Sequence, residues 1–356
     1  MLSNILITGA GGYVGGSLIA HFLANTNELI RRDQIIAAVR SQEQADALSK
    51  LGISVLQLDL SNEDSVVKSV LQHDISIVIH TASAMDPSMA LPLITALGKQ
   101  KQANGREACF IHTSGLGAFY EKTGWPTGLL RDTDDVFDTE KRLADSFPLR
   151  KTDVAVIEHA EKRGVNSFIV VPSTVYGQGS GEWNKLSVIL PLYIRASLSA
   201  KAVYKFPDYS KVSGVHISDL TGLYGLIVER VLRRESLPSG REGYYFALAH
   251  DIFLGEVGDH LASELRDRGV TTKSEARRYS DEQAAAASMG VPVQFVQMLW
   301  DSDANIVAEI PRSIGWKPAW DKARFLRHIG DEVQAVLTLG RPRSSLVDSL
   351  LAPPRT

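Results

Sequence analysis

Hydrophobic positions in the first half of the chain follow two alternating patterns. Short runs of consecutive apolar residues, many of them β-branched, indicate strands that are buried on both faces. These runs are separated by stretches with helical spacing, such as 42–51 and 64–71. The expected strands are 5–8, 35–39, 55–58, 75–80, 109–113 and 167–171. The alternation predicts an α/β fold with a doubly wound parallel (Rossmann) sheet and right-handed crossovers.

The pattern becomes irregular after about residue 176. A loop is expected at 177–184, and helices at 186–199 and 219–234. Another helix should start near Ser280, because Ser280 and Gln283 have capping-box spacing ahead of an alanine run.

These changes divide the chain into three parts. Residues 1–176 form the predicted dinucleotide-binding domain, to which residues of about 205–235 return. Residues 177–340 form a smaller C-terminal α/β lobe that is expected to bind substrate, and 341–356 form a tail with several prolines.

Composition and charge exclude several classes of partner. A net charge of -3 gives no attraction for nucleic acid or for an anionic membrane. No stretch has the ~20 uninterrupted apolar residues of a membrane span. The single cysteine, Cys109, cannot form an internal disulfide, so we expect a cytoplasmic protein. No metal is expected, because the chain lacks His-Glu-x-x-His and Cys-x-x-Cys spacings.

Three glycines join the first strand to the helix expected at 17–23. They are Gly9, Gly12 and Gly15. Backbone N–H groups and the dipole at a helix N-terminus attract a pyrophosphate, and glycine lets the ligand approach the backbone. We therefore predict a dinucleotide on this turn, with Tyr13 and Val14 also in contact.

The segment Thr8-Gly9-x-x-Gly12-x-x-Gly15 resembles the opening motif of the extended short-chain dehydrogenases/reductases. Within them it is similar to the epimerase/dehydratase and dihydroflavonol-reductase group, and to epimerase-like fungal members. Further similar segments follow in the family's order, at 58–60, 78–83, 111–114, 171–177, 215–220 and 314–318. The resemblance therefore covers nearly the whole chain.

This resemblance implies further cofactor contacts. Residues 59–60 correspond to the family's step beside the adenine, and 81–83 to its segment along the cofactor. Residues 172–173 correspond to its segment beside the nicotinamide, where Val171 replaces the usual arginine. The implied contact residues are Asp59, Leu60, Thr81, Ala82, Ser83, Pro172 and Ser173.

The end of the second strand bears on the choice of cofactor. NAD-selective members tend to have a carboxylate there for the ribose hydroxyls. Val39 fills that place here, and Arg40 follows it. A guanidinium can pair with the additional 2′-phosphate of NADP(H), which is the cofactor we predict. A solvated surface arginine and the binding of both cofactors remain as alternatives.

The resemblance also implies a catalytic Ser/Thr, Tyr and Lys, the last two being four residues apart. Ser114 is the expected hydroxyl, with Thr113 second. Lys151 falls where the lysine belongs and should also hold the cofactor ribose. Phe147 falls where the tyrosine belongs, and phenylalanine has no proton to exchange.

Two tyrosines are candidate replacements, Tyr120 near Ser114 and Tyr176 beside the nicotinamide segment. Either is equally interpretable as a packing residue. His112 precedes Thr113 on a strand, so its side chain is expected to point into the packing of the sheet.

The leading hypothesis is an NADP(H)-dependent oxidoreductase that transfers hydride to or from a small apolar carbonyl, imine or alcohol. Secondary metabolism is the expected setting for such an enzyme. One alternative is an isomerase, epimerase or cyclase that retains or recycles NADP(H). Another is a dinucleotide-binding sensor without catalysis. Fold alone does not distinguish them. The expected partners are the small-molecule substrate and, as an open alternative, a second copy of the chain.

Overall fold

Seven parallel strands form the central sheet of the computed structural model, which describes residues 3–25, 29–300 and 305–343. The strand order is β11-β7-β5-β4-β1-β2-β3. The strands are β1 Asn4–Thr8, β2 Ile35–Val39, β3 Ser54–Gln57, β4 Ile75–His80, β5 Cys109–Thr113, β7 Asn166–Pro172 and β11 Tyr244–Ala247. The predicted doubly wound parallel sheet is confirmed, and its first six strands lie where the apolar runs predict them. β11 is an edge strand that the pattern analysis missed.

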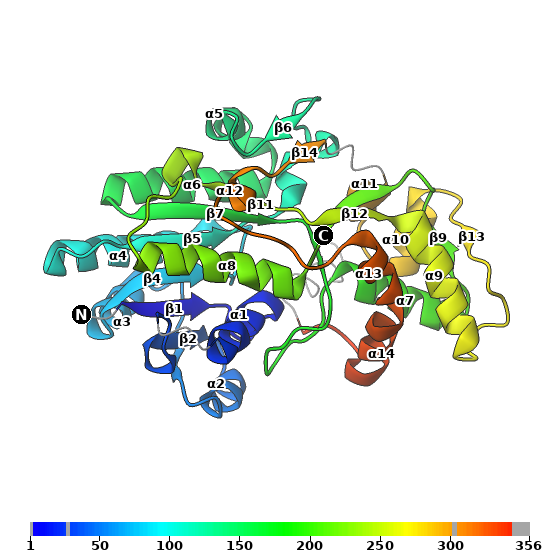
Figure 1. The fold of residues 1–356 in the computed structure, drawn as a ribbon, viewed down its shortest axis with the longest axis horizontal. Helices are drawn as coiled ribbons and strands as arrows, with labels where there is room; N and C mark the ends of the chain where they lie inside the picture. The colour runs from blue at the N-terminus through cyan, green and yellow to red at the C-terminus, as the bar shows by residue number, and fades with distance from the viewer. Residues whose placement is uncertain (1–2, 26–28, 301–304, 344–356) are drawn as a thin grey trace, which may run out of the picture.

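Helices cover both faces of this sheet (Figure 1). The helices on one face are α1 Tyr13–Ala24, α2 Gln42–Ser49 and α8 Ile217–Leu232. Those on the other face are α3 Glu63–Gln72, α4 Leu91–Asn104 and α6 Pro148–Arg163. Alternate strand residues point to opposite faces, so Ile5 and Ile7 pack under α1 and α8 while Leu6 packs on the α3 side. Both faces of each strand are therefore buried, which is why the strands consist of consecutive apolar residues.

A second, smaller unit follows β7 along the chain and lies beside the sheet (Figure 1). Its three-stranded sheet has the order β12-β10-β8. The strands are β8 Thr174–Tyr176, β10 Lys211–His216 and β12 His250–Phe253. Its helices are α7 Ile189–Ala200, α9 Leu254–Asp267, α10 Glu282–Met289, α11 Val293–Trp300, α13 Lys322–Arg327 and α14 Ile329–Leu339. These elements share a third apolar core.

Short elements complete the fold. Two pairs of two-residue strands are β6 Leu130–Arg131 with β14 Ile306–Val307 and β9 Tyr204–Lys205 with β13 Arg277–Arg278. The short helices α5 Val136–Arg142 and α12 Ile310–Ser313 lie outside the second unit's core. Among the described residues, every helix is too short or too polar to span a lipid bilayer.

The local expectations for the second half need small corrections. The N-cap of α10 is Asp281 rather than Ser280, because the Asp281 carboxylate accepts the N–H of Ala284 at 2.7 Å. The helix expected at 219–234 starts at Ile217, where the His216 ring accepts the N–H of Ser218. The predicted tail lies mostly outside the described residues, from 344 onward.

The two late family-like segments, 215–220 and 314–318, meet in space at the start of α8. The indole N–H of Trp316 donates to the carbonyl of Asp219 at 2.9 Å. The Asp219 carboxylate accepts the N–H groups of Ala319 and Trp320 at 3.0 Å each. This contact fixes the return of the chain from the second unit toward the central sheet.

Candidate functional site

The central sheet places a crevice between β1 and β4. From β1 the chain proceeds outward to β2 and β3, then returns to β4 on the other side of β1. Helices connecting strands on opposite sides of such a switch point diverge, and ligands bind there at the carboxyl ends of the strands. The turn 9–15, the end of β2 and residues 81–83 all lie at these ends.

Each glycine of the turn meets a different constraint. Gly9 has a left-handed backbone, φ 66°, and a Cβ there would lie 2.7 Å from the Thr81 carbonyl group. A Cβ on Gly15 would lie 2.7 Å from Thr81 Oγ1, so α1 packs tightly against the strands. Near Gly12, a Cβ would meet only the Gly9 carbonyl oxygen, at 2.9 Å. Gly12 therefore borders open space, into which a ligand can come close to the backbone.

The N-terminus of α1 is uncapped. Gly12 is its N-cap residue, and no described side chain caps the helix or places an acidic group in its first turn. The first N–H groups, which include those of Tyr13 and Val14, are thus left for an anion at the positive end of the helix dipole.

A glycine-rich loop, residues 177–185, packs over this first turn. The Tyr13 hydroxyl donates to the Gly177 carbonyl at 2.6 Å, so this predicted cofactor residue holds the loop through its side chain. A Cβ on Gly181 would lie 2.8 Å from Gly16 Cα. The N–H of Asn184 donates to the Gly11 carbonyl at 3.3 Å. The run Gly-Gln-Gly-Ser-Gly at 177–181 is the sequence feature that indicates such close packing of the loop on the helix.

The end of β2 presents one cation beside the turn. Val39 is buried and Arg40 is exposed. The Arg40 guanidinium makes no hydrogen bond or ion pair with the described residues, while its backbone is held by Gln44 and Gln57. The Gln44 amide also lies against Gly11, where a Cβ would meet its Nε2 at 2.8 Å. Gln44, which sequence reasoning did not select, therefore bridges the turn and the end of β2.

The remaining predicted cofactor residues lie along the same strand ends. Asp59 is exposed beyond β3, and hydrogen bonds from Ser61 lower its pKa. Its neighbour Leu60 packs against the core on the α3 side. Thr81 donates to the Thr8 carbonyl at 2.7 Å, and Ser173 donates to the Ala247 carbonyl at 2.9 Å.

A buried histidine also contacts the segment after β4. The Ser83 carbonyl lies 3.1 Å from the His80 ring. Ala82 and Pro172 are partly exposed. Burial lowers the pKa of His80 to about 3, so this ring is neutral. The segment 81–83 is thus held at one end by the Thr81 hydroxyl and at the other by the His80 ring.

Ser114 lies at the carboxyl end of β5 and contacts a buried acid. Its hydroxyl donates to Asp153 Oδ2 at 2.5 Å. The other oxygen of Asp153 is 3.3 Å from His112 Nε2, and both side chains are fully buried. The expected inward direction of His112 therefore holds. Thr113 points elsewhere and bonds the Tyr224 hydroxyl at 2.6 Å.

The structure does not bring Lys151 to Ser114. Lys151 is 64% exposed and lies 3.5 Å from Asp145. Two residues along a helix rotate the side chain by about 200°, so Lys151 and Asp153 lie on nearly opposite faces of α6. The face toward Ser114 carries Asp153 and, four residues earlier, Leu149, which lies 3.4 Å from a Cβ built on Gly115. The α6 positions that face Ser114 are therefore Leu149 and Asp153, each two residues beyond Phe147 and Lys151.

Neither candidate tyrosine is the hydrogen-bond partner of the Ser114 hydroxyl, which is Asp153 among the described residues. Tyr120 packs in the core on the α3 side, and its hydroxyl makes no hydrogen bond with the described residues. Tyr176 lies in the core of the second unit and bonds the His250 ring at 2.8 Å. Burial raises the pKa of both phenols, which makes them weak acids. Phe147 is the N-cap residue of α6 and packs under the Arg150 guanidinium.

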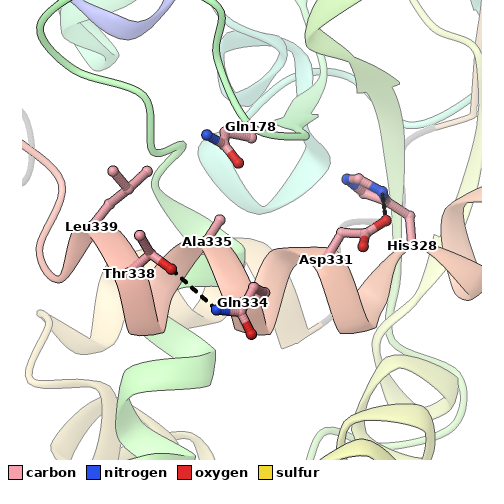
Figure 2. Close-up of a pocket in the computed structure, with 7 residues that line it drawn as sticks. All are labelled: Gln178, His328, Asp331, Gln334, Ala335, Thr338 and Leu339. Atoms are coloured by element: carbon pink, nitrogen blue, oxygen red, sulfur yellow. Dashed lines mark hydrogen bonds and ion pairs between the residues drawn. The ribbon is translucent and has the colours of Figure 1, made fainter.

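A separate pocket of about 310 Å³ opens between α14 and the start of the 177–185 loop. Figure 2 shows Gln178 facing α14 across this pocket, with His328 paired to Asp331 at one end. None of the predicted site residues lines it. Next to it, the fully buried carboxyl of Glu332 accepts the N–H of Gly177 at 2.5 Å. The pocket therefore belongs to the packing of the loop rather than to the crevice.

These features define a Rossmann-type α/β fold with a crevice at the carboxyl ends of its parallel strands. The predicted family resemblance is confirmed, since residues 5–96 match the model of the NAD dependent epimerase/dehydratase family. The chain is 24% identical over 337 residues to the oxidase ucsJ of an Acremonium species, covering 89% of this chain and 93% of the relative. It is 23% identical to the dTDP-4-dehydro-6-deoxy-D-allose reductase of Streptomyces bikiniensis, covering 61% and 70%.

A solved structure shares the fold along nearly the whole chain. The dTDP-glucose 4,6-dehydratase of Bacillus anthracis, in complex with NAD, has a TM-score of 0.64 and 13% identity, and the match covers 95% of this chain and 97% of that one. The fold class is therefore shared with known dinucleotide-binding enzymes.

The buried Glu332 gives a testable pH dependence. Burial raises its pKa from 4.5 to about 7, so the folded chain keeps a proton that the unfolded chain releases in this window. The wild-type free energy of unfolding should therefore fall as pH rises from about 4.5 to about 7, by roughly 3 kcal/mol from this group. Glu332→Gln should lack that part of the slope in urea unfolding. Equal slopes in both proteins would contradict the assignment, and the exposed Glu256→Gln serves as control.

Proposed function

We propose that the protein is an NADP(H)-dependent oxidoreductase for a small apolar carbonyl, imine or alcohol. The observation that carries the proposal is the β1–α1 turn, where Gly12 leaves a path to an uncapped helix N-terminus. Beside it lies the Arg40 side chain, which has no partner among the described residues. Such a cradle fits a pyrophosphate with an additional phosphate nearby. Enzymatic relatives of reductase and dehydratase type support the same class of chemistry.

The residues present fit a nicotinamide dinucleotide. The turn 9–15 would hold its pyrophosphate, Arg40 a 2′-phosphate, and the segments 81–83 and 172–173 would border its nicotinamide half. When bound, this cofactor supplies or accepts a hydride at the substrate carbon. The protein must then orient the substrate and deal with the charge on its oxygen.

Ser114 is the residue placed for that second task. Its Oγ is at the strand end where the crevice lies, and Asp153 fixes its orientation. The neighbouring position on α6 is Leu149, an apolar side chain that cannot exchange a proton. A well-placed acid/base is typically worth about 10²–10⁴-fold in rate, so simple ketones require another proton path through Ser114, whereas an iminium needs none.

The first prediction from this proposal concerns cofactor choice. Wild-type protein should bind NADPH about tenfold more tightly than NADH, because a charge-assisted contact from Arg40 to the 2′-phosphate contributes about 1.4 kcal/mol. Calorimetric titration of Arg40→Ala should show that preference lost. Arg31→Ala, at the other end of β2 and paired with Asp33, is the matched control. Equal affinities of the wild type for both dinucleotides would exclude the NADP(H) assignment.

The second prediction concerns the turn. Gly12→Val should abolish dinucleotide binding while secondary structure is retained, because the new side chain occupies the approach to the helix N-terminus. Gly222→Val, in a position on α8 with no atom within 4 Å of a built Cβ, should bind as wild type. Circular dichroism with binding measurements decides. A folded Gly12→Val variant that still binds would place the cofactor elsewhere.

A further inference from the structure

Two carboxyl groups lie side by side beneath Ser114, inside the core. Asp153 and Glu140 are each fully buried, and the two carboxyl groups interact electrostatically with one another. Glu140 Oε2 accepts the Tyr244 hydroxyl at 2.5 Å. Its Oε1 and Asp153 Oδ1 are both buried without a donor from any described group. A proton on one of the two carboxyl groups would give these acceptor oxygens the donor that they lack.

The surroundings do not neutralise two negative charges. The buried Arg150 of α6 donates hydrogen bonds to the carbonyls of Ala118 and Thr123 and to the hydroxyls of Thr123 and Ser146. None of these hydrogen bonds goes to either carboxyl group of the pair. From β5, His112 approaches Asp153 at 3.3 Å. A dry, unpaired second carboxylate would be costly, which favours one retained proton.

The groups packed around the two carboxyl groups also favour one retained proton. Burial, and then the charge of Asp153, raise the pKa of Glu140 well above its usual value. From β11, Tyr244 donates only a neutral hydrogen bond. From β4, His80 stacks on His112 at 5.6 Å between ring centroids and is itself neutral. Asp153 is the acceptor for Ser114, which leaves Glu140 as the partner on which the retained proton rests in the arrangement inferred below.

We propose that Glu140 and Asp153 share one proton and that this pair supplies it through Ser114 to the substrate oxygen, in place of the missing Tyr and Lys. The inference rests on the proposed function. Ser114 is the group that touches substrate, while Asp153 and Glu140 are positioning and proton-storing residues behind it.

A reduced nicotinamide is the reductant in the proposed step. The substrate carbonyl carbon gains a hydride from it, the C=O π bond breaks, and the oxygen gains the Ser114 Oγ proton to give an alcohol. Glu140 passes its proton to Asp153, and Asp153, once protonated, returns a proton to Ser114 Oγ. The pair is left one proton short until water restores it, and oxidation of the alcohol runs the same path backward.

The geometry argues against a hydrolytic triad built from the same residues. Such a triad places His between Ser and the acid, so that the imidazole takes the serine proton. Here Asp153 lies between Ser114 at 2.5 Å and His112 at 3.3 Å. His112 is fully buried and cannot reach a leaving group.

Infrared difference spectroscopy tests the shared proton without any cofactor. At about pH 8, above the pKa of about 7 of Glu332, wild type should show the C=O band of a buried protonated carboxylic acid. Glu140→Gln keeps an acceptor for Tyr244 and should lose the band. Asp132→Asn, which alters a buried acid that caps residues 309–310, should keep it. Unfolding midpoints check that the variants are folded.

Kinetics test the relay. With NADPH, Glu140→Gln should lower kcat for a carbonyl substrate about 10²-fold, flatten its pH profile and leave KM unchanged, while an iminium substrate reacts at the wild-type rate. Asp132→Asn should match wild type on both. The inference is overturned if the wild type lacks the band. It is also overturned if Glu140→Gln keeps both the band and the wild-type rate on the carbonyl substrate, even where the protein is an active reductase. If the band behaves as expected but NADPH neither binds nor reacts, the proposed function fails and the relay fails with it.

Discussion

The close approach of the β1–α1 turn to the end of β4 is the constraint on which the rest of the site depends. Gly9 and Gly15 both lie against Thr81, at distances that leave no room for a Cβ. This packing aims the uncapped N-terminus of α1 into the crevice between β1 and β4. The 177–185 loop then covers the same turn through Tyr13. A larger residue at Gly15 would move the helix, the loop and the cradle together.

The features that the sequence predicted well are those decided locally. Runs such as Ile75–His80 are buried on both faces, so their apolar character alone marks them as strands. The turn at Gly9 is likewise readable, because its spacing follows a strand directly. The rotation of α6 is not local: Phe147 and Lys151 have the right spacing, but burial against β5 selects Leu149 and Asp153. β11 was missed because an edge strand of four residues carries too short a pattern.

The proposed chemistry follows from the residues that stand on α6 where a Tyr and Lys pair was expected. Where a phenol and an ammonium group are expected, the helix offers Leu149 and a carboxylate that orients Ser114. A buried acid needs either a counterion or a proton, and Arg150 is committed to backbone carbonyls and hydroxyls. The altered helix and the buried Glu140 are therefore two parts of one arrangement. It suits proton transfer through a serine, or substrates that need no proton.

Hydrogen–deuterium exchange with and without NADPH tests most directly whether the cofactor lies on the turn. The account predicts slower exchange in NADPH at the amides of residues 9–16 and 39–41 and of the 81–83 segment, because these line the crevice at the strand ends. Peptides of the second unit around α9 and α10 should exchange unchanged and serve as the internal reference. Unchanged exchange at 9–16, with or without protection elsewhere, would contradict it.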